Sequence, residues 1–165
     1  MSATPLQNGS ANEELSLVER VESWFAEAEA LAAKGHPDLG IVRAVSATEV
    51  FLKQVFLSPY LRRRVLVGHG EFADLVADCL LEGPRWRERL KPTLRLLWGI
   101  DVGAMPSWAG LNSAWMTRNK IVHGGEECDA ATATAHIASC RTFAHALLHA
   151  RAAARTAQAG PATLC

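Results

Sequence analysis

The sequence predicts an all-α fold: a single compact bundle of about five to six helices with a long C-terminal helix. Apolar residues recur every three or four positions through most of the chain, which is the period of a helix with one buried face. Glycines and prolines separate these periodic segments, and no segment alternates as a convincing strand would. At 165 residues and 49% hydrophobic content, the chain can bury one core but is too short for two ordinary domains.

The first helix is expected over residues 12–34. Its apolar residues lie at helical spacing, glutamates stand near its start, and Gly35 follows its end. The polar residues 1–12 contain Ser, Thr, Pro, Gln, Asn and Gly, a composition typical of a disordered lead-in. We therefore place the helical domain at residues 13–157, followed by a frayed tail over residues 158–165.

The second helix is expected over residues 38–57, and Pro59 should end it because proline disrupts a helix interior. A short basic turn over residues 60–64 and a glycine-bounded loop then lead to a third helix over residues 71–81. This arrangement places a run of consecutive arginines between two helices.

Three more helices complete the predicted bundle. A helix over residues 85–98 contains Pro92, which predicts a kink or an early end. After a loop over residues 99–107, a helix over residues 108–122 ends at a pair of glycines. A polar loop then leads to a long alanine-rich helix over residues 130–157.

The charges are unevenly distributed although their sum is zero. Residues 1–40 carry seven acids against two bases, whereas residues 41–99 carry ten bases against six acids. The middle bases stand among tryptophans, which suits single-stranded nucleic acid because cations follow phosphates while rings stack on bases. An ordinary solvated helix face explains the same pattern. The residues predicted to bind nucleic acid are Arg85, Arg87, Arg89, Lys91 and, further along the chain, Lys120.

The cysteines indicate a reducing compartment. Cys79, Cys128, Cys140 and Cys165 are irregularly spaced in a chain with ample core, which favours free thiols over a disulfide framework. No hydrophobic segment approaches the roughly 20 residues that cross a bilayer, and the first residues lack the pattern of a secretory signal. We therefore expect a cytoplasmic protein with no membrane contact.

One constellation near the end of the 108–122 helix carries chemistry. Arg118, Asn119 and His123 stand in the pattern Arg-Asn-x-x-x-His-Gly. Arginine is a permanent cation whose forked donors suit phosphate, and histidine exchanges its proton near neutral pH. Together they supply the parts for breaking a phosphodiester without a metal. A structural explanation also exists, since the arginine can form an ion pair and the histidine can favour the negative end of a helix.

Helical geometry separates the two basic members of this motif. Five residues at about 100° each place Arg118 and His123 roughly 140° apart, whereas Asn119 and His123 share a face. Two arrangements would let the arginine and the histidine act on one substrate. Either the helix unwinds before Gly124 so that the histidine swings round, or a second copy of the domain supplies the complementary residue.

The motif resembles the Arg-x4-6-His signature of the HEPN superfamily (higher eukaryotes and prokaryotes nucleotide-binding domains). It stands late in a short all-α chain, with a loop and one long helix after it. The resemblance implies a homodimer whose two motifs form a composite, metal-independent endoribonuclease site that uses no cofactor. In that site Arg118 would hold the scissile phosphate of the RNA, His123 would transfer protons, and Asn119 would orient either partner. Such domains occur in toxin–antitoxin pairs and antiphage systems, which implies an antitoxin or defence partner.

One position departs from the family pattern. In toxins that pair with minimal nucleotidyltransferase antitoxins, a tyrosine typically follows the histidine by two positions and receives nucleotide from the partner. This chain has Gly125 there. The departure argues against that form of regulation.

An acid in the second helix is a further candidate for the site. Glu49 lies within an apolar stripe, where a carboxylate is costly unless it is paired, so it could orient Arg118. It could equally lie at the edge of the stripe and pair with Lys53, four residues later.

Other candidate sites are weaker. His145 and His149 are spaced for a metal, but they lie opposite His136 and Cys140 and lack a third ligand, so no metal site is expected. The tryptophans are expected in the core or in dimer contacts.

Two candidate functions remain. The first function is a ribonuclease acting as a toxin or antiphage effector. The second is a non-catalytic helical scaffold that binds RNA, a nucleotide or a partner protein at the same groove.

Overall fold

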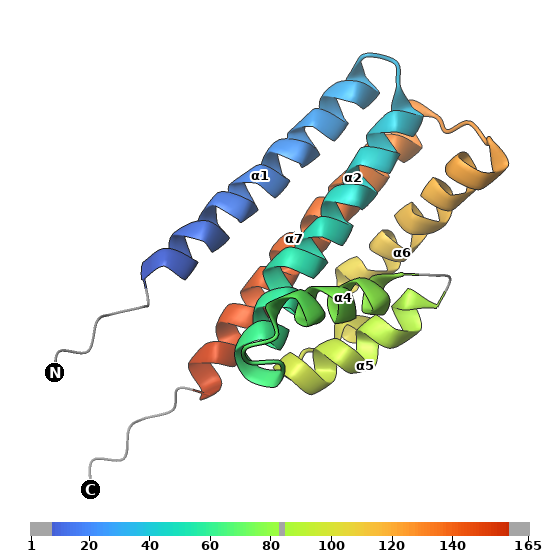
Figure 1. Cartoon of the computed structure of the whole chain (residues 1–165). Coiled ribbons are helices and arrows are strands. Elements are labelled where there is room, and N and C mark those ends of the chain that lie inside the picture. The colour runs from blue at the N-terminus through green and yellow to red at the C-terminus, as the bar shows by residue number, and fades with distance from the viewer. Residues whose placement is uncertain (1–7, 83–84, 159–165) are drawn as a thin grey trace, which may run out of the picture.

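All regular structure in the described residues is helical, which confirms the predicted all-α bundle with a long last helix. The computed structural model describes the backbone of residues 8–82 and 85–158 and the side chains of residues 16–82 and 85–154. The elements (Figure 1) are α1 (Asn8–Ala33), α2 (Pro37–Phe51), the π-helix η1 (Leu52–Leu57), α3 (Ser58–Tyr60), the π-helix η2 (Leu61–Val65), α4 (Gly70–Leu81), α5 (Trp86–Trp98), the 3-10 helix η3 (Val102–Ala104), α6 (Pro106–Asn119), the π-helix η4 (Lys120–Gly124) and α7 (Ala130–Gln158).

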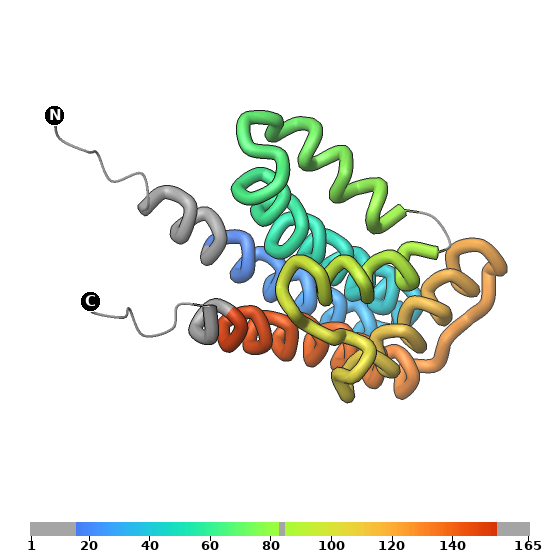
Figure 2. Tube along the Cα trace, turned by 90° about the horizontal axis from the view of Figure 1, so that it is seen from below, coloured from blue at the N-terminus to red at the C-terminus, as the bar shows by residue number. Residues whose placement is uncertain are grey.

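The body of the bundle is formed by α1, α2, α6 and α7. α1 and α2 form an antiparallel hairpin, α7 packs against α1, α2 and α6, and α4 and α5 lie together beside them (Figure 1). The N-terminal part of α1 and the C-terminal part of α7, as far as the structure describes them, lie at one end of the bundle, and the α6–α7 connection lies at the other (Figure 2). None of the helices in the described ranges is both long and apolar enough to cross a membrane. The largest fully buried side chains are Phe25, Phe51, Phe56, Phe143, Ile41, Leu52, Leu57, Leu90, Leu94, Leu111, Ile137 and Leu147.

The first helix begins earlier than predicted. α1 starts at Asn8, so residues 8–12, predicted as part of a disordered lead-in, are helical in the structure. Adding residues to an existing helix costs little compared with nucleating one, so a helix can extend beyond its amphipathic stretch. Residues 1–7 lie outside the described residues, as do residues 159–165 of the predicted frayed tail.

The second helix differs most from the prediction, because the chain stays helical through Pro59. α2 continues into η1, α3 and η2, so the predicted basic turn is a π-helix. In an α-helix the carbonyl of Val55 would accept the N–H of residue 59, which proline lacks. Here that carbonyl accepts a hydrogen bond from Nη1 of Arg151 on α7, at 2.9 Å. A tertiary contact thus replaces the partner that the proline removes.

Pro92 and Pro106 also lie within helices. Pro92 does not end α5, which runs on to Trp98. Pro106 starts α6 inside the segment predicted as a loop, since the first turn of a helix needs no N–H from proline. The two helices pack through the rings of Trp86 and Trp115, which are buried with their centroids 3.9 Å apart. The predicted core role of these tryptophans is confirmed.

Candidate functional site

The end of α6 positions the motif. Buried Trp115 fixes the rotation of α6 and leaves Arg118 and Asn119 half-buried at its last turn. His123 follows in η4 and is exposed. Gly125 has a left-handed backbone (φ 64°), a conformation that suits glycine, and it ends the helix where the glycine pair predicted. The histidine therefore stands at a helix C-terminus, as expected.

The last helical turn is a π-helix, which changes the spacing within the motif. Its hydrogen bonds span five residues instead of four, so each residue turns through less than the about 100° of an α-helix. Arg118 and His123 are thus separated by less than the roughly 140° of an ideal α-helix. The chain thus stays helical to Gly124 and does not unwind before it, whereas the arrangement with a second copy of the domain stays a prediction. Short π segments are rare, and they occur frequently at functional sites.

Arg118 has a buried donor that meets no acceptor among the described residues. Its Nη1 donates to Oδ1 of Asn119 at 3.0 Å. Its Nε is buried, and no described residue accepts a hydrogen bond from it. Such a group costs on the order of 1–3 kcal/mol, and more when it is charged. Because this atom is closed to solvent, a phosphate oxygen would pair with the other donors of the guanidinium fork.

The charge of Arg118 affects the pKa of Glu49 of α2. Burial raises the pKa of Glu49 above its ordinary value of 4.5, and the positive charge of Arg118 opposes this rise. Lys53, the other partner considered for Glu49, pairs instead with Asp78, with 2.5 Å between Nζ and Oδ1. The structure therefore favours Arg118 as the cation that acts on Glu49.

A second histidine, which sequence reasoning considered only as a metal ligand, contacts the helix that carries the motif. His136 Nε2 of α7 lies 3.1 Å from Oγ1 of Thr117, the residue before Arg118. Burial lowers the pKa of His136, an effect that the carboxylate of Asp129 opposes. No pattern in the sequence could identify this contact, because it depends on how α6 packs against α7.

Two of the cations predicted to bind nucleic acid are exposed. Lys120 lies next to the motif, and Arg85 lies just before α5. Lys120 begins η4, and its Nζ lies 3.5 Å from Oε2 of Glu126. Both side chains of this pair are more than half exposed, so the pair contributes little stability. Arg85 is exposed just before α5. Both cations can therefore meet a ligand at little cost.

The other predicted cations of α5 are engaged within the fold. Arg87 donates to Oδ1 of Asn112 on α6. Arg89 donates to a backbone carbonyl at the end of α4. Nζ of Lys91 lies 5.0 Å from the ring centroid of Trp108. These contacts hold α5 against its neighbours, which makes the three residues weaker candidates for RNA binding than Lys120.

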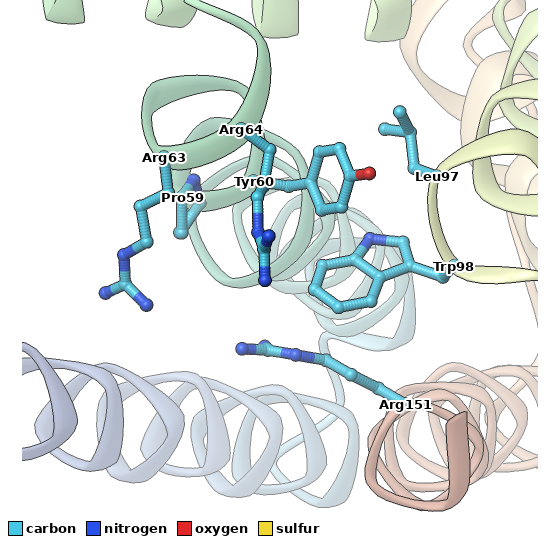
Figure 3. Close-up of a pocket in the computed structure, with 7 residues that line it drawn as sticks. All are labelled: Pro59, Tyr60, Arg63, Arg64, Leu97, Trp98 and Arg151. Carbon is cyan, nitrogen blue, oxygen red and sulfur yellow. The ribbon is translucent and has the colours of Figure 1, made fainter. Parts of the chain in front are cut away.

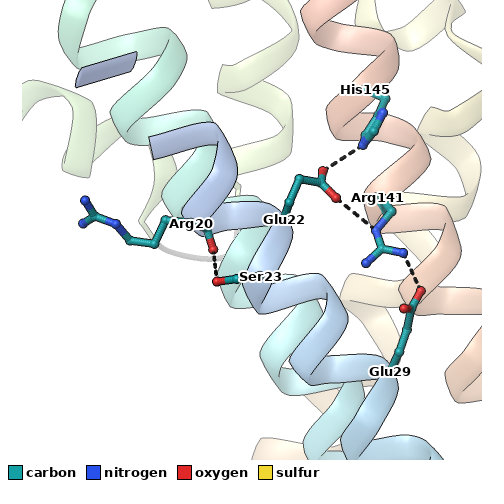
Figure 4. Close-up of polar contacts among 6 residues, drawn as sticks. All are labelled: Arg20, Glu22, Ser23, Glu29, Arg141 and His145. Atoms are coloured by element: carbon teal, nitrogen blue, oxygen red, sulfur yellow. Dashed lines mark hydrogen bonds and ion pairs between the residues drawn. The ribbon is translucent and has the colours of Figure 1, made fainter. Parts of the chain in front are cut away.

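The histidines considered as metal ligands, His145 and His149, are not part of a metal-binding group in the described residues. His145 contacts Glu22 of α1, with 2.7 Å between Nε2 and Oε1, and Arg141 joins Glu22 to Glu29 (Figure 4). These polar contacts connect α1 to α7. Within residues 16–82 and 85–154, no three His, Cys, Asp or Glu side chains form a group that could hold a metal ion.

The candidate site thus consists of Arg118 and Asn119 of α6 and His123 of η4. His136 of α7 contacts the neighbouring Thr117, and the charge of Arg118 acts on Glu49 of α2. Arg118 and Asn119 are hydrogen-bonded neighbours, and His123 is accessible on the widened turn that follows them. Comparisons of the chain with protein-family models, with curated proteins and with solved structures gave no match. The proposed function therefore rests on the site and on the resemblance of its motif.

Proposed function

We propose that this chain is a metal-independent endoribonuclease of the HEPN type that acts as a homodimer. The observation that carries the proposal is the end of α6, where half-buried Arg118 is hydrogen-bonded to Asn119 and exposed His123 follows on a π turn. An arginine that can bind an anion and an accessible histidine are the groups that phosphodiester cleavage requires. Asn119 supports this arrangement by accepting a hydrogen bond from the arginine.

The reaction would use the 2′-hydroxyl of the RNA as the nucleophile. The 2′-oxygen forms a bond to phosphorus, its proton passes to a base, and the bond from phosphorus to the 5′-oxygen breaks. The leaving oxygen takes up a proton, and the products are a 2′,3′-cyclic phosphate and a 5′-hydroxyl. His123 transfers the protons, and Arg118 stabilises the negative charge that develops on the phosphate oxygens.

Two copies of the motif would form one groove in the dimer. His123 of one protomer would then act on a phosphate that the partner's Arg118 holds, so the angle between the two residues in one chain does not limit catalysis. Lys120, exposed on the same turn, would bind a neighbouring phosphate. The resemblance of the motif extends the proposal to a toxin or antiphage effector that a partner protein controls.

Cleavage of a labelled single-stranded RNA in EDTA tests the activity. The wild-type protein should leave 2′,3′-cyclic phosphate ends, and Arg118→Ala and His123→Ala should each lower the rate by about 10²-fold or more. Lys34→Ala, which removes an exposed cation at the end of α1, should leave the rate unchanged. If folded, dimeric wild-type protein is as inert as both variants, the ribonuclease proposal is wrong and the scaffold function takes its place.

Mixing the two inactive variants tests whether the site is composite. Random pairing of Arg118→Ala with His123→Ala makes about half of the dimers heterodimers, and each heterodimer has one complete site if the two residues come from different protomers. The mixture should then recover about a quarter of the wild-type rate. A mixture as inactive as its components would show that both residues act from the same protomer.

A further inference from the structure

A second candidate site lies at the opposite end of the bundle from the motif. A pocket of about 260 Å³ opens between α3, η2, the end of α5 and α7 (Figure 3). The N-terminal part of α1 and the C-terminal part of α7 lie at this same end of the bundle (Figure 1). The residues around the pocket include Tyr60, Arg63, Arg64, Trp98 and Arg151.

The described lining of the pocket is positively charged. It contains three arginines, and none of the described lining residues carries a carboxylate. The neighbouring Arg62 pairs with Asp74, whereas Arg63 and Arg64 are exposed and form no ion pair with any described residue. Figure 3 shows the guanidinium groups of Arg64 and Arg151 approaching the same space from different helices. The exposed guanidinium groups of Arg63 and Arg64 would attract an anion into this space.

Two aromatic rings line the same pocket. Tyr60 and Trp98 pack edge to face, with their centroids 4.8 Å apart. The guanidinium carbon of Arg151 lies 5.1 Å from the Trp98 centroid, and its Nη1 is held by the carbonyl of Val55. Arg151 is only 5% exposed, so its position is set by the core. The pocket therefore combines a buried cation, exposed surface cations and planar apolar surfaces.

These groups define the chemistry of a ligand. Arginine forks bind phosphate oxygens in pairs, and aromatic rings and guanidinium planes stack on bases. A volume near the lower end of ordinary ligand pockets suits one phosphate and one ring system. We propose that this pocket binds a nucleotide, with its phosphate on Arg63 and Arg64 and its base against Tyr60 and Trp98. The nucleotide is either a free ribonucleoside monophosphate or one residue of a single-stranded RNA.

The assignment is independent of RNA cleavage, because it uses none of the residues of the motif. Calorimetric titration of the full chain with the four ribonucleoside 5′-monophosphates, a nucleoside and inorganic phosphate tests it. At least one monophosphate should bind more tightly than both the nucleoside and phosphate. Arg63→Ala and Arg64→Ala should each weaken that binding by about tenfold or more, since each removes a charge-assisted hydrogen bond.

Two controls separate the pocket from general electrostatics. Lys34→Ala removes one exposed cation elsewhere and should not change the affinity for the monophosphate. Tyr60→Leu should weaken binding of the monophosphate by about fivefold or more while leaving the affinity for phosphate unchanged, because it removes a stacking surface. Circular dichroism confirms that each variant is folded.

The same titration has outcomes that overturn the proposal. It is wrong if no monophosphate binds the wild-type chain more tightly than phosphate does, or if both arginine variants bind like Lys34→Ala. Competition distinguishes the two sources of the nucleotide. A short single-stranded oligoribonucleotide that displaces the monophosphate identifies RNA as the ligand, and failure to displace it identifies the free nucleotide.

Discussion

Replacing Arg151 by methionine should lower the free energy of unfolding by about 2–5 kcal/mol. Methionine keeps an apolar stem but removes every donor. The substitution leaves the Val55 carbonyl without the hydrogen bond that now spans 2.9 Å, at a cost of about 1.5–3 kcal/mol for a charged donor. It also removes contacts of the guanidinium carbon at 5.2 Å from the Phe56 centroid and 5.1 Å from the Trp98 centroid, worth about 0.5–2 kcal/mol together.

Urea unfolding at 25 °C, followed by far-ultraviolet circular dichroism, measures this loss. Arg43→Met is the matched control, because Arg43 also forms a hydrogen bond, to Glu27, and lies 4.7 Å from the centroid of Trp24. Its side chain is 34% exposed, so its removal should cost less than about 1 kcal/mol. An Arg151→Met loss no larger than that of Arg43→Met would refute the role assigned to the buried arginine.

A double-mutant cycle with Pro59→Ala tests the physical reason. Alanine restores the N–H that an α-helix would direct to the Val55 carbonyl, so Arg151 is then no longer the only substitute donor. The cost of Arg151→Met should be smaller by about 1 kcal/mol in the Pro59→Ala background. Equal costs in both backgrounds would show that Arg151 does not compensate for the proline.

Three further predictions concern the acid, the helix crossing and the thiols. The folded chain holds the proton of Glu49 more tightly than the unfolded chain does, so ionisation destabilises the fold as the pH rises above 4.5. Glu49→Gln should therefore raise the free energy of unfolding at pH 7, with no gain well below pH 4.5, and should slow RNA cleavage if the acid orients the site. Gly40→Ala should cost about 1–3 kcal/mol in urea unfolding, because the new Cβ would lie 2.8 Å from a backbone oxygen of α1, whereas Gly70→Ala meets nothing closer than 3.9 Å and should cost little. Burial raises the pKa of Cys140 to about 12, so iodoacetamide should label exposed Cys79 in the native protein and Cys140 only after unfolding, as peptide mass spectrometry can show.

Much of the fold follows from local patterns. The limits of α4 and α7 agree closely with the apolar periodicity and the flanking loops. The rule that proline ends a helix assumes that the segment keeps α geometry and that no other group donates to the carbonyl four residues before the proline. Neither assumption holds at Pro59. The structure has π turns there and a hydrogen bond to that carbonyl from a residue 96 positions away. A contact of that range leaves no local pattern.

The candidate site shows the same division. The spacing of Arg118, Asn119 and His123 places them at the end of one helix, and the glycines after them predict where it stops. The choice of Arg118 over Lys53 as the cation that acts on Glu49 depends on how α2 packs against α6 and on the position of Asp78. Neither follows from spacing along a helix.

The sequence by itself determined the helical class, the order of the helices and the identity of the motif, because periodicity, capping residues and prolines act over a few residues. Only the tertiary structure decided the π turn in the motif, the electrostatic effect of Arg118 on Glu49 and the pocket lined by Trp98 and Arg151. Each of these depends on which helices meet and at what rotation. That outcome is set by the packing of the whole core, to which every buried side chain contributes.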